Sequence, residues 1–446
     1  MSKRLVILGG GESGAGAALL AKKKGYEVLL MDESSLKDGY RKMLKNEGIE
    51  FLEQRIDERR LLAAEEIVKS PGIPEKNNWM QKIRTNEIPV ISEIELAYRH
   101  KEGSRIIAIT GSNGKSTTTS LIYHICKTAG LDCALVGNIG YSFAAQVATD
   151  PKPLYVAEIS SFQLDDIVTF RPDVAVLMNI TEDHLDRYDY KFENYIRSKF
   201  RITINQTSKD FFIYNLDDKI ITDYIELNPI HSIQLPISMK QKVEKGGYIQ
   251  NDEMHIKANG EQQQMSIYDF ALKGKHNQYN TMAASVAGAT MDIRKNKIRE
   301  AVQTFENLEH RMEPVSTVRG VDFVNDSKAT NVNSAWFALE SMTKPTVLIL
   351  GGIDKGNDYA LLEGLVAEKV KAIVCMGIDN TKIHQAFDGK VGRIVDTASA
   401  EEAVRVAFSL SAPGDVVLLS PACASFDLFK NYEDRGNQFK DAVRNL

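Results

Sequence analysis

Short apolar runs alternate with longer stretches of helical pattern along almost the whole chain. The runs end at Gly, Asp or Ser, and this alternation is typical of βα units that build parallel sheets. The pattern predicts strands at residues 5–8, 28–31, 66–69, 89–91, 105–110, 154–157, 174–178, 321–325, 347–350, 372–376 and 416–419. We therefore expect an α/β fold with three series of parallel strands.

Residues 206–270 differ from the rest in composition and pattern. They are polar, rich in Lys, Asp, Gln and Asn, and contain short segments that alternate apolar and polar residues. We interpret them as a small β-rich insertion. Boundaries near residues 95 and 306 predict a Rossmann-like N-terminal domain (1–95), a central parallel-sheet domain of the P-loop ATPase type (96–306) and a Rossmann-like C-terminal domain (307–446). The length of 446 residues agrees, since a domain takes roughly 150 residues.

Composition and charge narrow the class of protein. Hydrophobic residues make up 43% of the chain and charged residues 26%, which excludes disorder as the main state. The net charge of −5 has the wrong sign for a protein that neutralises a nucleic-acid backbone. A bilayer span needs about 18 apolar residues, and no apolar run of the chain approaches that length. The apolar run 5–8 ends at three glycines, which favours a strand over a signal peptide. We expect a cytoplasmic protein with reduced thiols at Cys126, Cys133, Cys375 and Cys423.

The segment 110–117 carries the strongest local signal for chemistry. It follows a strand rich in β-branched residues and precedes a helical stretch, 118–128. A Gly-rich turn at a helix N-terminus directs backbone N–H groups at one anion, and the helix dipole adds to the attraction. Lys115 is expected to reach the β- and γ-phosphates of a nucleotide, and the hydroxyl of Ser116 or Thr117 to contact Mg²⁺. Ile109 stands where the complete phosphate-loop pattern has its first glycine.

The next two predicted strands also end in groups that suit a metal ion. Glu158 follows 154–157, and His184 lies shortly after 174–178. In open α/β sheets, ligands bind outside the carboxyl ends of the parallel strands, so these side chains are expected beside the Gly-rich turn. Carboxylate and imidazole there favour a Mg²⁺ site, whereas each residue alone also fits an ordinary helix cap or turn.

The first predicted strand is followed by a second Gly-rich turn. Residues 9–14 fit G-x-G-x-x-G, and Asp32 ends the next strand, where a ribose-binding acid is expected. These features by themselves predict a dinucleotide site. Because the unit is short and ATP has another predicted site, a different nucleotide is the alternative.

Together these motifs resemble the Mur ligase family, which builds the peptide of bacterial cell-wall precursors. The resemblance extends over essentially the whole chain and rests on residues 110–117, 137–140, 158–164, 181–188, 276–277, 310–311, 325–331 and 420–427. The Asp-Asn-Pro-Arg motif of the branch that adds diamino acids is absent, which favours the branch that adds D-glutamate.

The resemblance implies an ATP-dependent reaction in peptidoglycan synthesis. ATP phosphorylates the terminal carboxylate of UDP-N-acetylmuramoyl-L-alanine, and the amine of D-glutamate attacks the resulting acyl phosphate. It also implies ATP and two Mg²⁺ ions as cofactors, and we expect a monomer. Two alternatives stay open: another Mur-type or folylpolyglutamate-type ligase, although the latter lacks the N-terminal domain, and a P-loop nucleotide switch without ligase chemistry.

The resemblance also implies roles for particular residues. The catalytic residues are Lys115, Glu158, His184 and Lys199. ATP is assigned to Gly111, Ser112, Asn113, Gly114, Lys115, Ser116, Thr117, Asn277, Asn280, Arg311 and Asp326. The UDP substrate is assigned to Gly11, Glu12, Ser13, Gly14, Asp32, Ser70, Gly72 and Asn138. D-glutamate is assigned to Lys328, Thr330, Lys355, Ser425 and Phe429.

The implied metal ligands are Ser116, Thr117, Glu158, His184 and Lys199. An ammonium group has donors but no lone pair, so it cannot ligate a metal ion. We therefore predict that Lys199 is carbamylated by CO₂, which turns the cation into an oxygen ligand of the kind that Mg²⁺ prefers. For the pair at 310–311, a hinge between domains is the alternative to a ligand contact.

Overall fold

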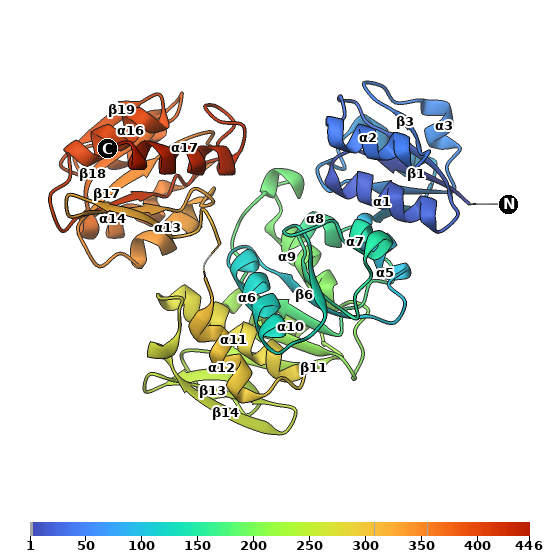
Figure 1. Cartoon of the computed structure of the whole chain (residues 1–446), viewed down its shortest axis with the longest axis horizontal. Helices are drawn as coiled ribbons and strands as arrows, with labels where there is room; N and C mark the ends of the chain where they lie inside the picture. Colours follow the sequence, from blue (N-terminus) through green and yellow to red (C-terminus); the bar gives the residue numbers. More distant parts are fainter. Residues whose placement is uncertain (1–2, 307, 355) are drawn as a thin grey trace. The chain divides into compact units, whose positions relative to one another are not determined.

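The computed structural model describes residues 3–306, 308–354 and 356–446, which form three β-sheets with flanking helices (Figure 1). Internal contacts group the chain into two compact units. The first unit comprises Met1–Ala271 and Tyr279–Phe305 and holds two of the sheets, and the second comprises Leu272–Gln278 and Glu306–Leu446 and holds the third. The α/β class with three sheet domains is confirmed, whereas the boundaries near 95 and 306 stay predictions.

The N-terminal sheet is five-stranded and parallel, in the order β3-β2-β1-β4-β5. Its strands are β1 (Arg4–Leu8), β2 (Glu27–Met31), β3 (Glu50–Leu52), β4 (Glu66–Lys69) and β5 (Val90–Ser92). Its helices are α1 (Glu12–Lys23), α2 (Asp38–Asn46), α3 (Glu58–Leu62), α4 (Asn78–Thr85) and α5 (Glu93–Arg99). The central strands are nearly continuous runs of buried residues, as expected where helices cover both faces.

The central sheet has nine strands in the order β14-β13-β12-β11-β10-β9-β6-β8-β7. Its strands are β6 (Arg105–Thr110), β7 (Cys133–Gly137), β8 (Leu154–Glu158), β9 (Val174–Leu177), β10 (Phe211–Asn215), β11 (Ile233–Ser238), β12 (Gly246–Gln250), β13 (Glu253–Ala258) and β14 (Glu261–Ser266). The helices around it are α6 (Lys115–Thr128), α7 (Phe143–Thr149), α8 (Ser161–Leu164), α9 (Phe192–Phe200), α10 (Lys219–Leu227), α11 (Lys275–Thr290) and α12 (Lys295–Thr304).

The β-rich segment predicted at 206–270 is present, but it continues the central sheet instead of standing apart from it. Strand β10 pairs in parallel with β9, and β11 and β12 follow in the same direction. Only β13 and β14 run antiparallel to their neighbours, as a meander at the edge. Buried and half-buried residues alternate along β13. This explains the polar composition of the segment, because a meander with one solvated face alternates apolar and polar residues.

The C-terminal sheet has the order β15-β16-β20-β17-β18-β19, and β15 is its one antiparallel strand. Its strands are β15 (Glu313–Val318), β16 (Val321–Asn325), β17 (Thr346–Leu350), β18 (Val370–Met376), β19 (Ile394–Thr397) and β20 (Val416–Leu419). Its helices are α13 (Val332–Glu340), α14 (Glu363–Lys369), α15 (Thr381–Phe387), α16 (Ala400–Ser409) and α17 (Tyr432–Arg444). Helices α13, α14 and α15 pack on one face of this sheet, and α16 and α17 on the other.

The strands that the sequence pattern missed lie mostly at sheet edges. Strands β3, β7, β15 and β19 each end a sheet, and several are short or only half buried. An edge strand needs no continuous apolar run, so periodicity gives it little signal.

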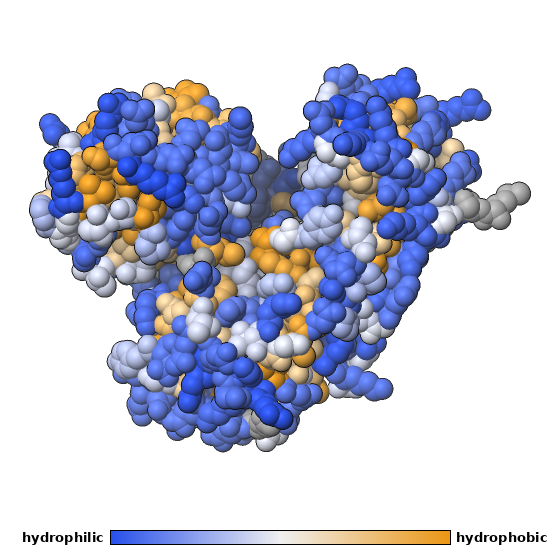
Figure 2. All heavy atoms as spheres, in the orientation of Figure 1, coloured by the Kyte–Doolittle hydropathy of each residue, from blue (hydrophilic) through white to orange (hydrophobic). Residues whose placement is uncertain are grey.

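Polar and charged residues cover most of the face of the molecule drawn in Figure 2. Large exposed apolar side chains are scattered along the chain, for example Leu227, Tyr190 and Ile378. Within the described part of the chain, no helix is both long enough and apolar enough to cross a membrane.

Helix α5 connects the first two sheets, and its first turn carries the buried carboxylate of Glu93. One oxygen of Glu93 accepts hydrogen bonds from the Ser142 hydroxyl at 2.7 Å and from the backbone N–H of Ala144 at 2.6 Å, at the start of α7. Burial raises the pKa of Glu93 to about 7, although these hydrogen bonds oppose the rise. The nearby carboxylate of Glu12 raises it further.

Glu95, two residues later, has the opposite balance. It accepts hydrogen bonds from the backbone N–H groups of Val168, Thr169 and Phe170 and pairs with Arg99 at 2.8 Å. Burial opposes ionisation here as well, but the hydrogen bonds and Arg99 outweigh it and lower the pKa of Glu95. The two carboxylates therefore attach α5 to segments beside the central sheet, and folding shifts their pKa values in opposite directions.

The Glu93→Gln variant is expected to lose less stability than the wild-type protein as the pH rises. Because the pKa of Glu93 rises from 4.5 to about 7 on folding, its contribution to stability is complete below pH 4.5 and is lost as the pH rises through 7. The full shift corresponds to about 3 kcal/mol. Urea unfolding of both proteins at about pH 5 and about pH 8 measures the difference.

Glu95→Gln is the matched control on the same helix. Because folding lowers the pKa of Glu95, this variant should be less stable than the wild type at about pH 8, and the gap should close as the pH falls below 4.5 through the folded pKa. The same pH dependence in both variants would contradict this account of α5.

Candidate functional site

The Gly-rich turn 111–114 joins β6 to α6 and is built from backbone conformations that suit glycine. Gly111 has φ +150° and Gly114 has φ +80°. A Cβ at Gly114 would lie 2.5 Å from Oδ1 of Asn280. Ser116 and Thr117 are buried in the first turn of α6, directly behind the loop. The loop therefore has the backbone of an anion-binding turn at a helix N-terminus.

The end of β9 holds this turn in place. The backbone N–H of Asn113 donates to Oδ1 of Asn179 at 2.8 Å, and Nδ2 of Asn179 donates back to the Asn113 carbonyl at 3.0 Å. The hydroxyl of Ser112 contacts the carbonyl of Thr181 at 3.0 Å and the hydroxyl of Tyr195 at 3.1 Å. Sequence reasoning missed Asn179 and Tyr195 as parts of the site, although Asn179 immediately precedes the 181–188 motif.

Two lysine side chains meet at the same carbonyl of the turn. Lys115 Nζ donates to the carbonyl oxygens of Gly111 at 2.8 Å and Ser112 at 2.9 Å. Lys199 Nζ, from α9, also donates to the Gly111 carbonyl at 2.8 Å and lies 4.5 Å from the centre of the Tyr195 ring. The structure thus places Lys199 beside the turn, and the role that the resemblance implies for it stays a prediction.

Burial favours the neutral form of Lys199. Its side chain is almost inaccessible, at 1% exposure, and burial followed by the charge of Lys115 lowers the pKa of Lys199 well below its ordinary range. The carboxylates of Asp183, Asp165 and Glu158 oppose this shift without reversing it. A neutral amine is a nucleophile, whereas an ammonium group is not. Asp183 belongs to the 181–188 motif, and sequence reasoning missed its electrostatic interaction with Lys199.

Glu158 lies next to the turn, because β8 pairs with β6 and places Glu158 opposite Ile109. Its carboxylate is buried, and Oε1 accepts a hydrogen bond from Nδ2 of Asn138 at 2.9 Å. Among the described residues, Oε2 has no hydrogen-bond partner. A buried carboxylate oxygen without a donor is poorly solvated, so it suits a cation.

His184 lies after β9 in the left-handed region, with φ 53°. Its ring packs edge-on against Phe162 at 5.2 Å, and Nε2 is 3.6 Å from a carboxylate oxygen of Asp183. Its side chain is 39% exposed, so the imidazole is accessible to a ligand. The strand ends therefore bring together the Gly-rich turn, Glu158 and Lys199, with His184 on the adjoining loop.

Arg187 connects this loop to the N-terminal sheet. Its guanidinium donates to the carbonyls of Pro71 at 3.0 Å, Gly72 at 3.3 Å and Ile73 at 3.3 Å, and lies 4.3 Å from the centre of the Phe162 ring. The loop after β4, which holds Ser70 and Gly72, is thereby attached to the loop of His184.

The N-terminal Gly-rich turn closes against β1 and β2. The backbone N–H of Gly10 donates to Oδ2 of Asp32 at 2.6 Å, and that of Ser34 donates to Oδ1 at 2.7 Å. A Cβ at Gly14 would lie 1.8 Å from the Gly9 carbonyl, so α1 packs closely on the strand. One oxygen of the Glu12 carboxylate accepts a hydrogen bond from the N–H of Ser142 at 3.2 Å, at the start of α7.

Two residues predicted to bind ATP, Asn277 and Asn280, fall in different units. Asn280 accepts a hydrogen bond from the Thr118 hydroxyl at 3.2 Å, within the first unit. Asn277 belongs to the second unit and donates to the Lys273 carbonyl at 2.8 Å. In the second unit, burial and the charge of Arg311 lower the pKa of His276 to about 4.

Strands β16 and β20 bring the C-terminal motifs together. Ser420 donates to Oδ2 of the buried Asp326 at 2.9 Å, and burial raises the pKa of Asp326 to about 7. Lys328 Nζ lies 5.1 Å from the centre of the Tyr432 ring.

The other predicted D-glutamate residues have different surroundings. Thr330 is half-buried and donates its backbone N–H to the Lys328 carbonyl, and Ser425 is buried. Phe429 lies in the core on the α16 and α17 face, and Lys355 lies outside the described residues.

Three family models match the chain. The Mur ligase MurD-like N-terminal domain matches residues 3–92, the Mur ligase middle domain residues 109–288, and the Mur ligase glutamate ligase domain residues 310–423.

Related proteins match over the whole length. The UDP-N-acetylmuramoylalanine--D-glutamate ligase of Christiangramia forsetii is 53% identical, and that of Bacteroides fragilis 51%, each with 100% of both chains covered. Among solved structures, a UDP-N-acetylmuramate-alanine ligase from Thermotoga maritima has a TM-score of 0.64 at 15% identity, with 100% of both chains covered. A pseudomurein peptide ligase type C from Methanothermus fervidus has a TM-score of 0.63 at 18% identity and the same coverage.

The solved structures share the fold, while the sequence relatives and the family models show descent. The models together span most of the chain, and the relatives exceed 50% identity over its full length. The chain belongs to the Mur ligase family.

Proposed function

We propose that this chain is an ATP-dependent ligase that joins D-glutamate to UDP-N-acetylmuramoyl-L-alanine through an amide bond, in the synthesis of peptidoglycan precursors. The observation that carries the proposal is the full-length match to relatives of 49–53% identity that all bear the name UDP-N-acetylmuramoylalanine--D-glutamate ligase. The arrangement around the Gly-rich turn supports it, because amide formation at the expense of ATP needs a phosphate-binding loop with cations close by.

The proposed reaction has two steps. An oxygen of the substrate's terminal carboxylate attacks the γ-phosphorus of ATP, and ADP leaves with the electrons of the broken P–O bond. The amine nitrogen of D-glutamate then attacks the carbonyl carbon of the acyl phosphate, inorganic phosphate leaves, and the nitrogen loses its proton. Both steps bring anionic groups together, so the protein has to offset their charge.

Lys115 and the Gly-rich turn are proposed to hold the phosphates. The Lys115 ammonium, which lies folded over the carbonyls of Gly111 and Ser112, is already on the surface of the turn where a phosphate would bind. Backbone N–H groups at the start of α6 add donors, and the helix dipole favours negative charge there.

The donor set fits Mg²⁺, which we propose as a cofactor at two positions. Glu158 offers a buried oxygen without a hydrogen-bond partner, and Ser116, Thr117 and His184 add hydroxyl and imidazole groups. The neutral amine of Lys199 is proposed to attack CO₂, form an N–C bond and lose a proton, giving a carbamate that carries ligand oxygens. Bound Mg²⁺ supplies positive charge that offsets the phosphate oxygens.

The N-terminal sheet is proposed to bind the UDP part of the substrate, and the C-terminal unit to bind D-glutamate. The turn 9–14, with Asp32 holding its backbone, is a compact anion-binding turn at the start of α1, and Ser70 lies against it. D-glutamate carries two carboxylates, so its site needs at least two cationic or N–H groups, for which we propose Lys328, Thr330, Lys355 and Ser425.

The purified protein is expected to release ADP over many turnovers from ATP and UDP-N-acetylmuramoyl-L-alanine only with D-glutamate, among a panel of L- and D-amino acids. Lys115→Ala should slow this reaction at least about a hundredfold, because it removes a charge that stabilises the transition state. Lys127→Ala, which removes an exposed lysine on the same helix, is the control. Preference for another amino acid would favour a different ligase, and equally fast multiple-turnover ADP release without any acceptor would favour a nucleotide switch.

Lys199→Ala should be inactive and regain activity when formate or acetate is added, because a small carboxylate replaces the carbamate. Arg197→Ala, an exposed cation on the same helix, should stay active without additives. ¹³C NMR of the wild-type protein in ¹³CO₂-bicarbonate should show a carbamate signal that Lys199→Ala lacks. Wild-type activity of Lys199→Ala without additives would rule out the carbamate.

Lys328→Ala and Lys355→Ala should each raise the KM for D-glutamate at least about tenfold, because each leaves a substrate carboxylate without its cation. The KM values for ATP and the UDP substrate should change little in Lys355→Ala and Ser425→Ala. Lys344→Ala, whose ammonium pairs with Asp322 at 2.6 Å, is the control. Loss of UDP-substrate binding with an unchanged D-glutamate KM would contradict the assignment.

A further inference from the structure

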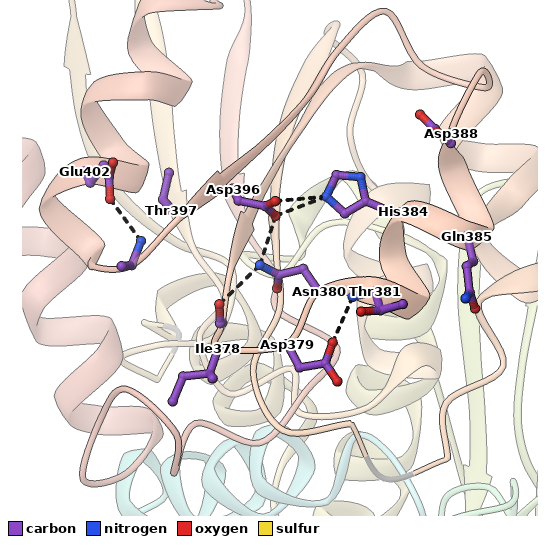
Figure 3. A pocket seen from close by; sticks show the side chains of 12 residues that line it. Ile378, Asp379, Asn380, Thr381, His384, Gln385, Asp388, Asp396, Thr397 and Glu402 are labelled. Carbon is purple, nitrogen blue, oxygen red and sulfur yellow. Dashed lines mark hydrogen bonds and ion pairs between the residues drawn. The ribbon is translucent and has the colours of Figure 1, made fainter.

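The C-terminal sheet has a crevice that the proposed reaction does not use. The chain leaves β18 for α15 on one face of the sheet and leaves the neighbouring β19 for α16 on the opposite face. Where the connections of adjacent parallel strands diverge in this way, a crevice forms outside their carboxyl ends, and ligands bind in such crevices. An open cavity of about 960 Å³ lies there, lined by Asn380, His384, Asp396 and neighbouring residues (Figure 3).

Three potential metal ligands lie close together here: His384 and Asp396 line the crevice, and the fully buried Cys375 is their neighbour. Cys375 on β18 and Asp396 on β19 are partners in the parallel register, so their side chains point to the same face of the sheet. Helix α15 packs on that face through Ile383 and Phe387, which brings His384 over the pair. The imidazole Nε2 lies 3.1 and 3.2 Å from the two carboxylate oxygens of Asp396. The sulfur, nitrogen and oxygen donors all lie within 4.8 Å of one another.

The surroundings favour a cation over an anion. The residues that line the cavity include Asp379, Asp388 and Glu402 besides Asp396, and none of those lining residues is Lys or Arg. Nδ2 of Asn380 donates to Oδ1 of Asp396 at 3.0 Å and so orients the carboxylate, as outer-shell partners of metal ligands do. Figure 3 shows His384, Asp396 and Asn380 joined in this way.

We propose that Cys375, His384 and Asp396 bind a divalent transition-metal cation of the Zn²⁺ class, with a further coordination position open to the crevice. A thiolate, an imidazole and a carboxylate together suit Zn²⁺ and its neighbours, whereas Mg²⁺ prefers oxygen ligands alone. The site is separate from the proposed Mg²⁺ ligands, which all belong to the first unit and include no cysteine.

Binding replaces the thiol proton of Cys375 by a metal–sulfur bond, and the proton is released to solvent. The apparent affinity should therefore increase with pH. The metal joins β18, β19 and α15, so it should also stabilise the C-terminal unit against unfolding.

Titration of the full-length protein with Co²⁺ tests the proposal, with excess Mg²⁺ present to occupy sites made of oxygen ligands. One Co²⁺ per chain should produce a thiolate-to-cobalt charge-transfer band, and equimolar Zn²⁺ should remove it. Cys375→Ser should abolish the band and weaken Zn²⁺ binding at least about tenfold. Cys423→Ser, which removes a second buried thiol of the same unit, should keep both the band and the Zn²⁺ affinity.

His384→Ala guards against a folding defect in Cys375→Ser, because the imidazole is partly exposed on α15 and its removal leaves the core intact. This variant should keep the wild-type circular dichroism spectrum and weaken Co²⁺ binding at least about tenfold. A charge-transfer band that survives in Cys375→Ser would overturn the proposal. The proposal would also be overturned if a folded His384→Ala variant kept the wild-type Co²⁺ affinity, or if the wild-type protein showed no charge-transfer band.

Discussion

The carbonyl oxygen of Gly111 accepts hydrogen bonds from both Lys115 and Lys199, and the rest of the proposed catalytic centre depends on how these two amines coexist. Two ammonium groups on one oxygen would repel each other, and the repulsion is strongest where the dielectric constant is low. Lys115 is half-buried, whereas Lys199 is almost fully buried, and burial together with the charge of Lys115 lowers the pKa of Lys199. The proposed roles follow this difference, with Lys115 as the cation for phosphate and Lys199 as the amine that reacts with CO₂ beside Glu158.

The N-terminal sheet is joined to the central sheet by a shared apolar core and by well-defined polar contacts. Arg187 links the loop after β4 to the loop of His184, and Glu95 accepts hydrogen bonds from three backbone N–H groups of the segment before β9. Through Arg187, the position of the loop after β4 depends on the loop that carries His184, a proposed metal ligand. In the C-terminal unit, the order of the strands positions the predicted site residues. The connections that follow β20 and its neighbours run to opposite faces of the sheet, and so do the connections that follow β18 and β19. The first divergence gathers Asp326 and Ser420, and the second forms the crevice that His384 and Asp396 line, next to Cys375.

Much of this architecture could be predicted because parallel α/β folds leave a regular trace in the sequence. Buried strands such as β6, β17 and β20 are apolar runs, and the residues that follow them lie at the carboxyl edge of their sheet. The Gly-rich turn, Glu158 and His184 were predicted as site residues in this way, because each directly follows such a strand or lies shortly beyond it. The edge strands β3, β15 and β19 were not predicted, since partial exposure removes the pattern on which the prediction rests. Strand β7 was also missed, although most of its residues are buried.

The sequence by itself therefore determined the fold class, the main strands and the side chains that stand at their carboxyl ends, because these follow from local periodicity and chain order. Only the tertiary structure decided which side chains from distant segments share one environment. Lys199 sits on a helix between two arginines, and no local pattern distinguishes it from a solvated lysine until α9 buries it against Gly111. Glu93 and Glu95 are two acids on one short helix, yet the groups packed against them shift their pKa values in opposite directions. Burial and electrostatic environment are properties of the packed chain, so they cannot be assigned until the segments are brought together.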